Sequence, residues 1–144
     1  MRRVSIVIAV CFVLALGISL IGQGRDLDAI MKEVGPLWQG AAGAPGLNAA
    51  ITNPMPDYMK IATDAAKLQG LFTEAEAQFT KMKMTEAAGF AKTAAEAAGA
   101  TAKEAKTGKL ADAKASATSI GQCKACHAKY RESDGAGGFK LKMQ

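Results

Sequence analysis

The sequence predicts an all-α protein: an antiparallel four-helix bundle behind an N-terminal signal or anchor helix. Two observations point to this fold class. Apolar side chains recur at steps of three and four over several segments after position 24, which is the spacing of one helix face. Leu, Ile, Val and Phe make up only 16 of residues 25–144, and alanine is abundant. Because β-branched and aromatic side chains are too few for a sheet, Ala-rich helices fit this composition better.

Residues 1–24 are expected to be a signal peptide or a membrane anchor. Arg2 and Arg3 precede an apolar run over Val4–Ile21, and this is the charge and hydropathy pattern of an export signal. The run also reaches the lower end of transmembrane lengths, so a retained anchor is the alternative. The sequence therefore predicts one domain, residues 25–144, located outside the cytoplasm.

The first helix of this domain is expected to begin at Asp26. Gly35-Pro36 should kink this helix or end it early, because proline lacks a backbone donor. Residues 40–56 are rich in glycine and proline and are expected to form a loop. The inward face of the helix comprises Leu27, Ile30, Met31, Val34 and Trp38.

Three more helices are expected after this loop. One begins near Pro56-Asp57, and a third runs from Thr85 to Lys106, with Thr107-Gly108 as its stop. A fourth runs from about Lys109 to Arg131, and residues 133–138 form a flexible exit. No strand pattern is found. The buried seam of the second helix is expected to comprise Tyr58, Ile61, Ala65, Leu68, Phe72, Ala75, Phe79 and Met82.

The charge balance is mildly basic, with 18 Lys and Arg against 13 Asp and Glu. We expect the excess to be spread along the chain, and this argues against a nucleic-acid binder, which needs a concentrated basic surface. No residue pattern resembles a catalytic base or nucleophile. The sequence therefore does not predict an enzyme.

The most specific motif is Cys123-Lys-Ala-Cys126-His127, the attachment signature for c-type haem. On a helix these three residues stand at i, i+3 and i+4, hence on one face. Both sulfurs can then form thioethers along one porphyrin edge, with His127 as the axial ligand of the iron. The macrocycle would also supply apolar surface that the helices lack, so we expect the haem-free chain to be poorly folded.

Other interpretations of the motif are weaker. A redox-active Cys-x-x-Cys pair normally lies at a strand-to-helix turn of an α/β fold, and this chain has no such pattern. A disulfide between Cys123 and Cys126 would strain a regular helix. Zinc would need a fourth ligand, and residues 25–144 contain no further cysteine or histidine.

The chain resembles the class II c-type cytochromes, the cytochrome c′ and cytochrome c-556 family. The resemblance spans residues 26–132 and rests on CKACHAKYR in the last helix, an Ala-rich third helix, and IMKEVGPLW in the first. It implies a four-helix bundle with one haem c. The position of the motif in the final helix selects this family, because the motif alone occurs in many cytochromes.

The resemblance also implies a sixth iron ligand. Ile30-Met31-Lys32 resembles the segment that supplies the methionine of low-spin members, so Met31 is expected to bind the iron. Its alternative is an ordinary core side chain. The other methionines that could bind the iron are Met55, Met59, Met82 and Met84. Of these, Met59 and Met82 are expected to face inward.

Two residues after the motif are expected to contact haem. Arg131 falls one turn beyond His127 and matches a basic residue of the family, although a solvated helix-end charge is its alternative. Tyr130 packs against the porphyrin edge or serves as a plain core aromatic.

The expected function is one-electron transport in the periplasm with redox protein partners. The first alternative is a high-spin cytochrome c′ that binds nitric oxide or carbon monoxide, although the chain lacks the early Arg-Gln pair of those relatives. The second is a membrane-anchored subunit of a larger complex, which requires that residues 4–21 persist. Relatives often pair through their first two helices, and the sequence does not decide between a monomer and such a homodimer.

Overall fold

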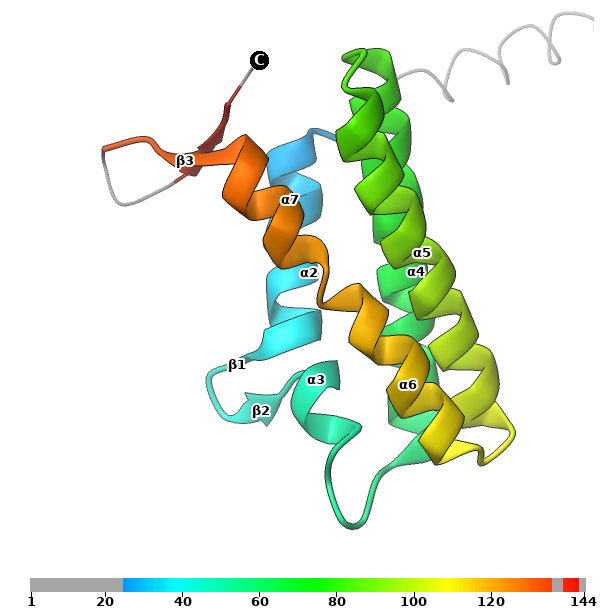
Figure 1. The fold of residues 1–144 in the computed structure, drawn as a ribbon. Coiled ribbons are helices and arrows are strands. Elements are labelled where there is room, and N and C mark those ends of the chain that lie inside the picture. The colour runs from blue at the N-terminus through cyan, green and yellow to red at the C-terminus, as the bar shows by residue number, and fades with distance from the viewer. Residues whose placement is uncertain (1–24, 136–138, 143–144) are drawn as a thin grey trace, which may run out of the picture.

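The computed structural model describes residues 25–135 and 139–142. The signal or anchor expected over residues 1–24 lies outside the described residues. The described chain is mostly helical, as the sequence predicts (Figure 1). Its elements are α2 (Leu27–Gln39), β1 (Gly40–Ala41), β2 (Ala44–Pro45), α3 (Leu47–Ala50), α4 (Tyr58–Lys81), α5 (Thr85–Lys106), α6 (Leu110–Ile120), α7 (Cys123–Tyr130), β3 (Arg131–Ser133) and β4 (Phe139–Leu141).

The two longest helices, α4 and α5, pack side by side and hold most of the core. The side chain of Asp57 caps α4 by accepting a hydrogen bond from the Lys60 N–H at 2.9 Å. Gly70 does not interrupt the helix, and the predicted seam is buried from Ile61 to Phe79. The prediction for the first residue of this seam is wrong: Tyr58 is 39% exposed, because it lies in the first turn of the helix.

The buried face of α5 is almost entirely alanine. Ala87 and Ala98 are fully buried, and these small side chains let α4 and α6 approach closely. Thr101 is also fully buried, and its hydroxyl donates to the Ala97 carbonyl at 2.8 Å, which satisfies its polar group. The helix ends before Gly108, whose φ of +74° suits glycine. The predicted bounds of this helix are confirmed.

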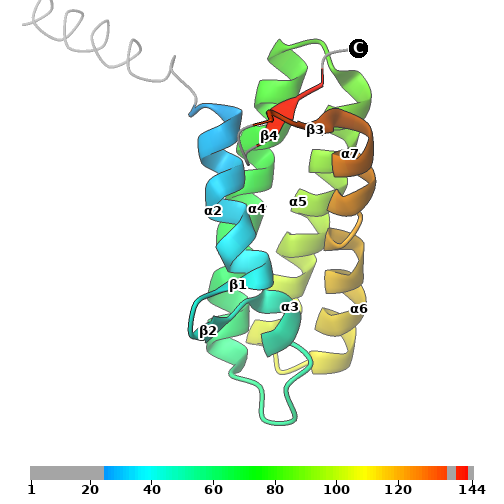
Figure 2. The same cartoon turned by 90° about the vertical axis from the view of Figure 1, so that its left-hand side faces the viewer.

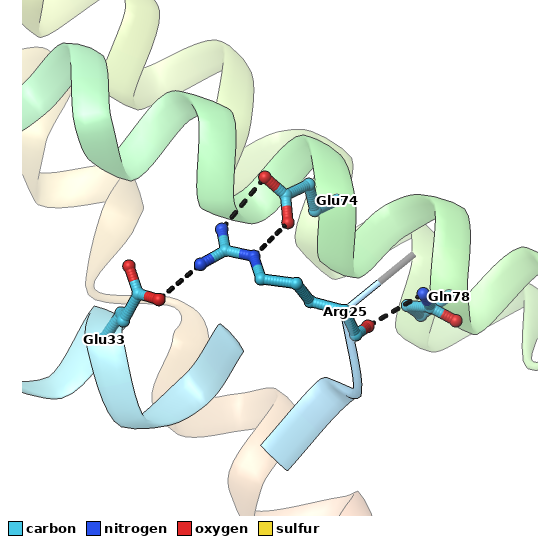
Figure 3. A network of polar contacts seen from close by, with 4 residues as sticks. All are labelled: Arg25, Glu33, Glu74 and Gln78. Atoms are coloured by element: carbon cyan, nitrogen blue, oxygen red, sulfur yellow. Dashed lines mark hydrogen bonds and ion pairs between the residues drawn. The ribbon is translucent and has the colours of Figure 1, made fainter. Parts of the chain in front are cut away.

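Helix α2 packs on α4 through Ile30 and Val34. Its start is fastened by Arg25, which forms ion pairs with Glu74 of α4 at 2.9 Å and with Glu33 (Figure 3). The backbone carbonyl of Arg25 also accepts a hydrogen bond from Gln78 Nε2 at 2.9 Å.

Of the two outcomes expected at Gly35-Pro36, a kink or an early end of α2, the early end is wrong. The helix continues through Pro36 to Gln39, and the Gly40 N–H donates to the Pro36 carbonyl at its end. Proline removes one backbone donor from the helix, but its ring fixes a φ that is compatible with a helix. Because Ile30 and Val34 are buried, tertiary packing stabilises α2 and the helix extends past Pro36.

Residues 40–56 are more ordered than the expected loop. β1 and β2 form a small antiparallel pair with Gly40 opposite Pro45, and α3 follows. Glycine is required at this turn, because Gly40 has φ +102° and a Cβ on Gly46 would lie 2.2 Å from the Gly40 nitrogen. Leu47 and Ile51 are buried against the core and hold the segment in place.

The fourth predicted helix is in fact two helices. The Gly121 N–H bonds to the Thr118 carbonyl at 3.1 Å and the Gln122 N–H bonds to Ser119 at 3.3 Å, so the chain tightens into a turn between α6 and α7. The prediction of one continuous helix up to about Arg131 is therefore wrong. The predicted absence of strands is also wrong, because two short antiparallel pairs are present. After Tyr130 the chain extends into β3, which pairs with β4 where a flexible exit was expected.

Helices α2 and α7 lie on the same side of the α4–α5 pair, with α2 beside α4 and α6–α7 beside α5 (Figures 1 and 2). α2 packs mainly on α4, whereas α6 and α7 pack on α5. α2 runs antiparallel to α6–α7, so its first turns lie at the same end of the molecule as α7 (Figures 1 and 2). Within residues 25–135 and 139–142, no helix is both long and apolar enough to cross a membrane.

Candidate functional site

The three residues of the attachment motif lie together on the short helix α7. Cys123, Cys126 and His127 stand at i, i+3 and i+4 within Cys123–Tyr130, so they share one face as predicted. Both cysteines are free thiols, half-buried and packed against the core. His127 is exposed, so its imidazole is accessible to a ligand or a metal.

The electrostatics of this face favour neutral side chains. Burial, reinforced by Cys126, raises the pKa of Cys123 to about 11. Burial, with a contribution from Glu86, also raises the pKa of Cys126. Burial and then Arg131 lower the pKa of His127. At neutral pH the site therefore presents two protonated thiols and an imidazole with a free lone pair.

These shifts bear on the alternative interpretations of the motif. A thiol-disulfide oxidoreductase uses a cysteine whose pKa is lowered, because the thiolate is the nucleophile. Here the pKa of both thiols is raised instead. The neutral imidazole of His127, by contrast, is the form that donates an electron pair to a metal.

A carboxylate from α5 fastens α7. Tyr130 Oη donates to Glu86 Oε2 at 2.8 Å, and Lys129 forms an ion pair with the same oxygen. The hydrogen bonds from Lys129 and then Tyr130 lower the pKa of Glu86. Tyr130 is 6% exposed, so this aromatic is a core residue with one polar contact. Sequence reasoning missed Glu86, because it lies 44 residues before Tyr130 and no local pattern links the two.

Arg131 does not continue the helix as expected. α7 ends at Tyr130, and Arg131 has extended dihedrals (φ −110°, ψ 128°) and begins β3. Its side chain is exposed, and its charge lies close enough to His127 to lower the pKa of that imidazole. The β3–β4 pair is joined to α7 by the Lys142 N–H, which donates to the Tyr130 carbonyl at 2.8 Å.

Met31 lies on α2, half-buried and packed against the core beside Ile30. Of its rivals, Met59 is 66% exposed and Met55 is 87% exposed, so the expectation that Met59 faces inward is wrong. It lies in the first turn of α4, which projects past the core. Met82, which was expected in the buried seam, is half-buried just after the end of α4.

A cavity of about 610 Å³ lies between the end of α2 with α3 and the α6–α7 turn. Trp38 was expected from the sequence to pack near this end of α2, and it lines one wall. Gly121, Gln122 and Lys124 line the other wall, next to Cys123 in the chain. The remaining lining residues are Asn48, Ile51, Thr52, Lys114, Ala117, Thr118 and Ala125. The volume is in the range of small-molecule sites, and the cavity reaches the start of α7 without including the two thiols.

Comparisons with known proteins give no relative. No protein-family model, characterised protein or solved structure matches the chain. Among the described residues, no group of three or more His, Cys, Asp and Glu side chains could hold a metal ion by itself.

Proposed function

We propose that this chain is a monohaem c-type cytochrome that carries single electrons outside the cytoplasm. One observation carries the proposal: Cys123, Cys126 and His127 share one face of α7, with both thiols free and half-buried. Two thiols that each add to a vinyl group, plus one neutral imidazole, are the donor set that haem c requires.

We further propose that α2, α4, α5 and α6–α7 enclose the haem as an antiparallel four-helix bundle. The support is that α2 and α7 pack on different neighbours and carry half-buried apolar side chains. Met31 and Leu27 on α2 and the two cysteines on α7 are such side chains. A porphyrin between them would remove their remaining apolar surface from water.

Each residue then has a defined role. The haem supplies a reversible one-electron change at its iron. Cys123 and Cys126 would hold the macrocycle on α7, and His127 would offer its lone pair to the iron. The Glu86 carboxylate holds Tyr130 and Lys129, so α7 keeps its position on α5. Met31 is proposed as the second side chain that would hold the iron, through its thioether sulfur, and such a ligand would favour electron transfer over substrate binding.

The test is maturation of the full chain with a c-type haem attachment system, followed by pyridine haemochrome analysis. We expect one covalently bound haem per chain. Replacing both cysteines (Cys123→Ser with Cys126→Ser) should abolish covalent haem, whereas Lys124→Ser between them should not. Properly exported protein without covalent haem would refute the proposal.

The spectrum of the reduced protein tests the axial ligands. A sharp low-spin α band that carbon monoxide does not change is expected for an electron carrier with His127 and Met31 on the iron. Prompt carbon monoxide binding with high-spin character would instead assign the chain to the gas-binding members of the family.

A further inference from the structure

The basic excess of the domain is concentrated and not spread along the chain as expected. Residues 25–122 contain eleven basic and eleven acidic side chains, so this long stretch is neutral. Residues 123–142 contain five basic and two acidic side chains. The whole excess therefore falls on the segment that carries the attachment motif.

The structure places four of these charges, those after Lys124, at one end of the molecule, and Lys124 lies at the start of α7 beside the α6–α7 turn. α7 and the β3–β4 pair are joined through the Tyr130 carbonyl, and the C-terminal strand lies at the same end as the α4–α5 turn in both views (Figures 1 and 2). We call this surface the basic end. Its members are all exposed: Lys124, Lys129, Arg131, Lys140 and Lys142.

Ion pairing within the basic end does not cancel its charge. Lys129 pairs with Glu86, and Lys140 pairs with Glu132 at 3.4 Å. Residues 123–142 contain three more basic than acidic side chains, so the segment keeps a positive net charge that includes Lys124 and Lys142. The adjacent α4–α5 turn adds exposed Lys81 and Lys83, with no acid between them.

We propose that the basic end is the docking surface for an acidic redox protein. The inference rests on the proposed function, because a carrier must bring its haem near a partner's centre. Local charge matters more than net charge here, since exposed charges act only within about 10 Å at moderate salt. A surface whose positive charge surrounds the attachment helix steers an acidic partner toward the haem rather than toward the neutral remainder.

An anionic lipid surface has a similar attraction for lysines. Arg25, the first described residue, lies at the start of α2, whose first turns are at this same end (Figure 2). We favour the protein partner because the positive charge follows the attachment motif, which is where a redox partner would have to approach. The experiment includes a lipid arm to separate the two.

The first measurement is the rate at which reduced holoprotein is oxidised by hexacyanoferrate(III), a trivalent anion. The test variant combines Lys124→Glu with Lys142→Glu, and the control combines Lys67→Glu with Lys109→Glu, two exposed sites away from the basic end. Both variants change the net charge equally. At low salt we expect the test variant to react roughly threefold more slowly than the control, and the gap should close at high salt. Equal rates would overturn the proposal.

The second measurement maps binding of poly-L-glutamate by amide chemical shifts. We expect perturbed amides in residues 123–135 and 139–142, with little change on α4. Perturbation centred elsewhere, or tighter binding to phosphatidylglycerol vesicles than to poly-L-glutamate, would overturn the proposal. Haem content is measured on the same samples, so a missing haem would refute the proposed function while the poly-L-glutamate result still judges the surface. Circular dichroism verifies that the variants fold.

Discussion

The α4–α5 pair and the helices that flank it are stabilised in different ways. α4 and α5 are long, bury a continuous face and meet through fully buried side chains such as Leu68 and Ala98. α2, α6 and α7 are shorter, and Tyr130 is the one buried residue of α7. Long helices can rely on packing against each other, but an eight-residue helix cannot hold itself together in water. The flanking side of the molecule is therefore where an additional apolar group contributes most.

The largest expected effect comes from removing the proposed haem. The double replacement of Cys123 and Cys126 by serine should destabilise α2, α6 and α7 by about 4 kcal/mol or more, because their half-buried side chains lose an apolar partner. Hydrogen exchange should report lost protection in these helices and retained protection in α4 and α5. Uniform loss over all helices would show that the two regions are not separable.

If Met31 is the proposed second iron ligand, Met31→Ala should convert the reduced spectrum to a form that binds carbon monoxide. Met59→Ala is the matched control, because Met59 is 66% exposed on α4. If the Met31 variant keeps an unchanged low-spin spectrum, another side chain holds that position.

Within the α4–α5 pair, Ala98→Leu should destabilise the protein by about 1–3 kcal/mol, because the site is fully buried and has no room for extra methyl groups. Ala77→Leu on the exposed face of α4 should change stability by less than about 0.5 kcal/mol. Chemical denaturation measures both. A tolerated leucine at position 98 would mean that the pair is more loosely packed than its burial indicates.

A smaller effect is expected from the contact that fastens α7. Tyr130→Phe removes the hydroxyl that donates to Glu86 but keeps the buried ring, so α7 should open at most about tenfold more often. Amide exchange over residues 124–130 measures this opening. Thr118→Val, at an exposed position of α6, is the comparison variant. If both variants raise the exchange rate of α7 equally, the contact with Glu86 has no special role in holding α7.

The smallest effect concerns the Arg25 contacts at the start of α2. The hydrogen bond from Arg25 lowers the pKa of Glu74 below its ordinary value. A carboxyl whose folded pKa is lowered stabilises the protein above its unfolded pKa, and this contribution disappears as the pH falls through the folded value. The pair is exposed, so the change should be slight and weaker in salt. In the Glu74→Gln variant, the free energy of unfolding should depend less on pH in the acidic range. An unchanged pH dependence would contradict a stabilising contact between Arg25 and the Glu74 carboxylate.

The helices with local boundary signals could be predicted from the sequence. Thr107-Gly108 marks the end of α5 and Asp57 the start of α4, and both bounds lie close to their predicted places. The three residues of the motif were placed on one helical face because their spacing alone determines it. Such features depend on a few neighbouring residues.

The features that sequence reasoning missed depend on distant partners or on small residues. Gly121 is the C-cap of α6 and a local helix-stop signal, but the Cys-Lys-Ala-Cys-His segment after it also fits a helix, so a single helix was expected. The β1–β2 and β3–β4 pairs contain few β-formers and are fixed by close backbone contacts. Glu86 is joined to Tyr130 only by the tertiary fold.

The turn between α6 and α7 makes the attachment helix a separable unit. Its eight residues follow a two-residue turn and precede a short strand, but Tyr130 and Lys129 hold them to Glu86 of α5. For protein engineers, a graft of this cysteine-histidine segment through Gly121 and Gln122 would therefore have to carry a carboxylate at the place of Glu86 on the receiving helix.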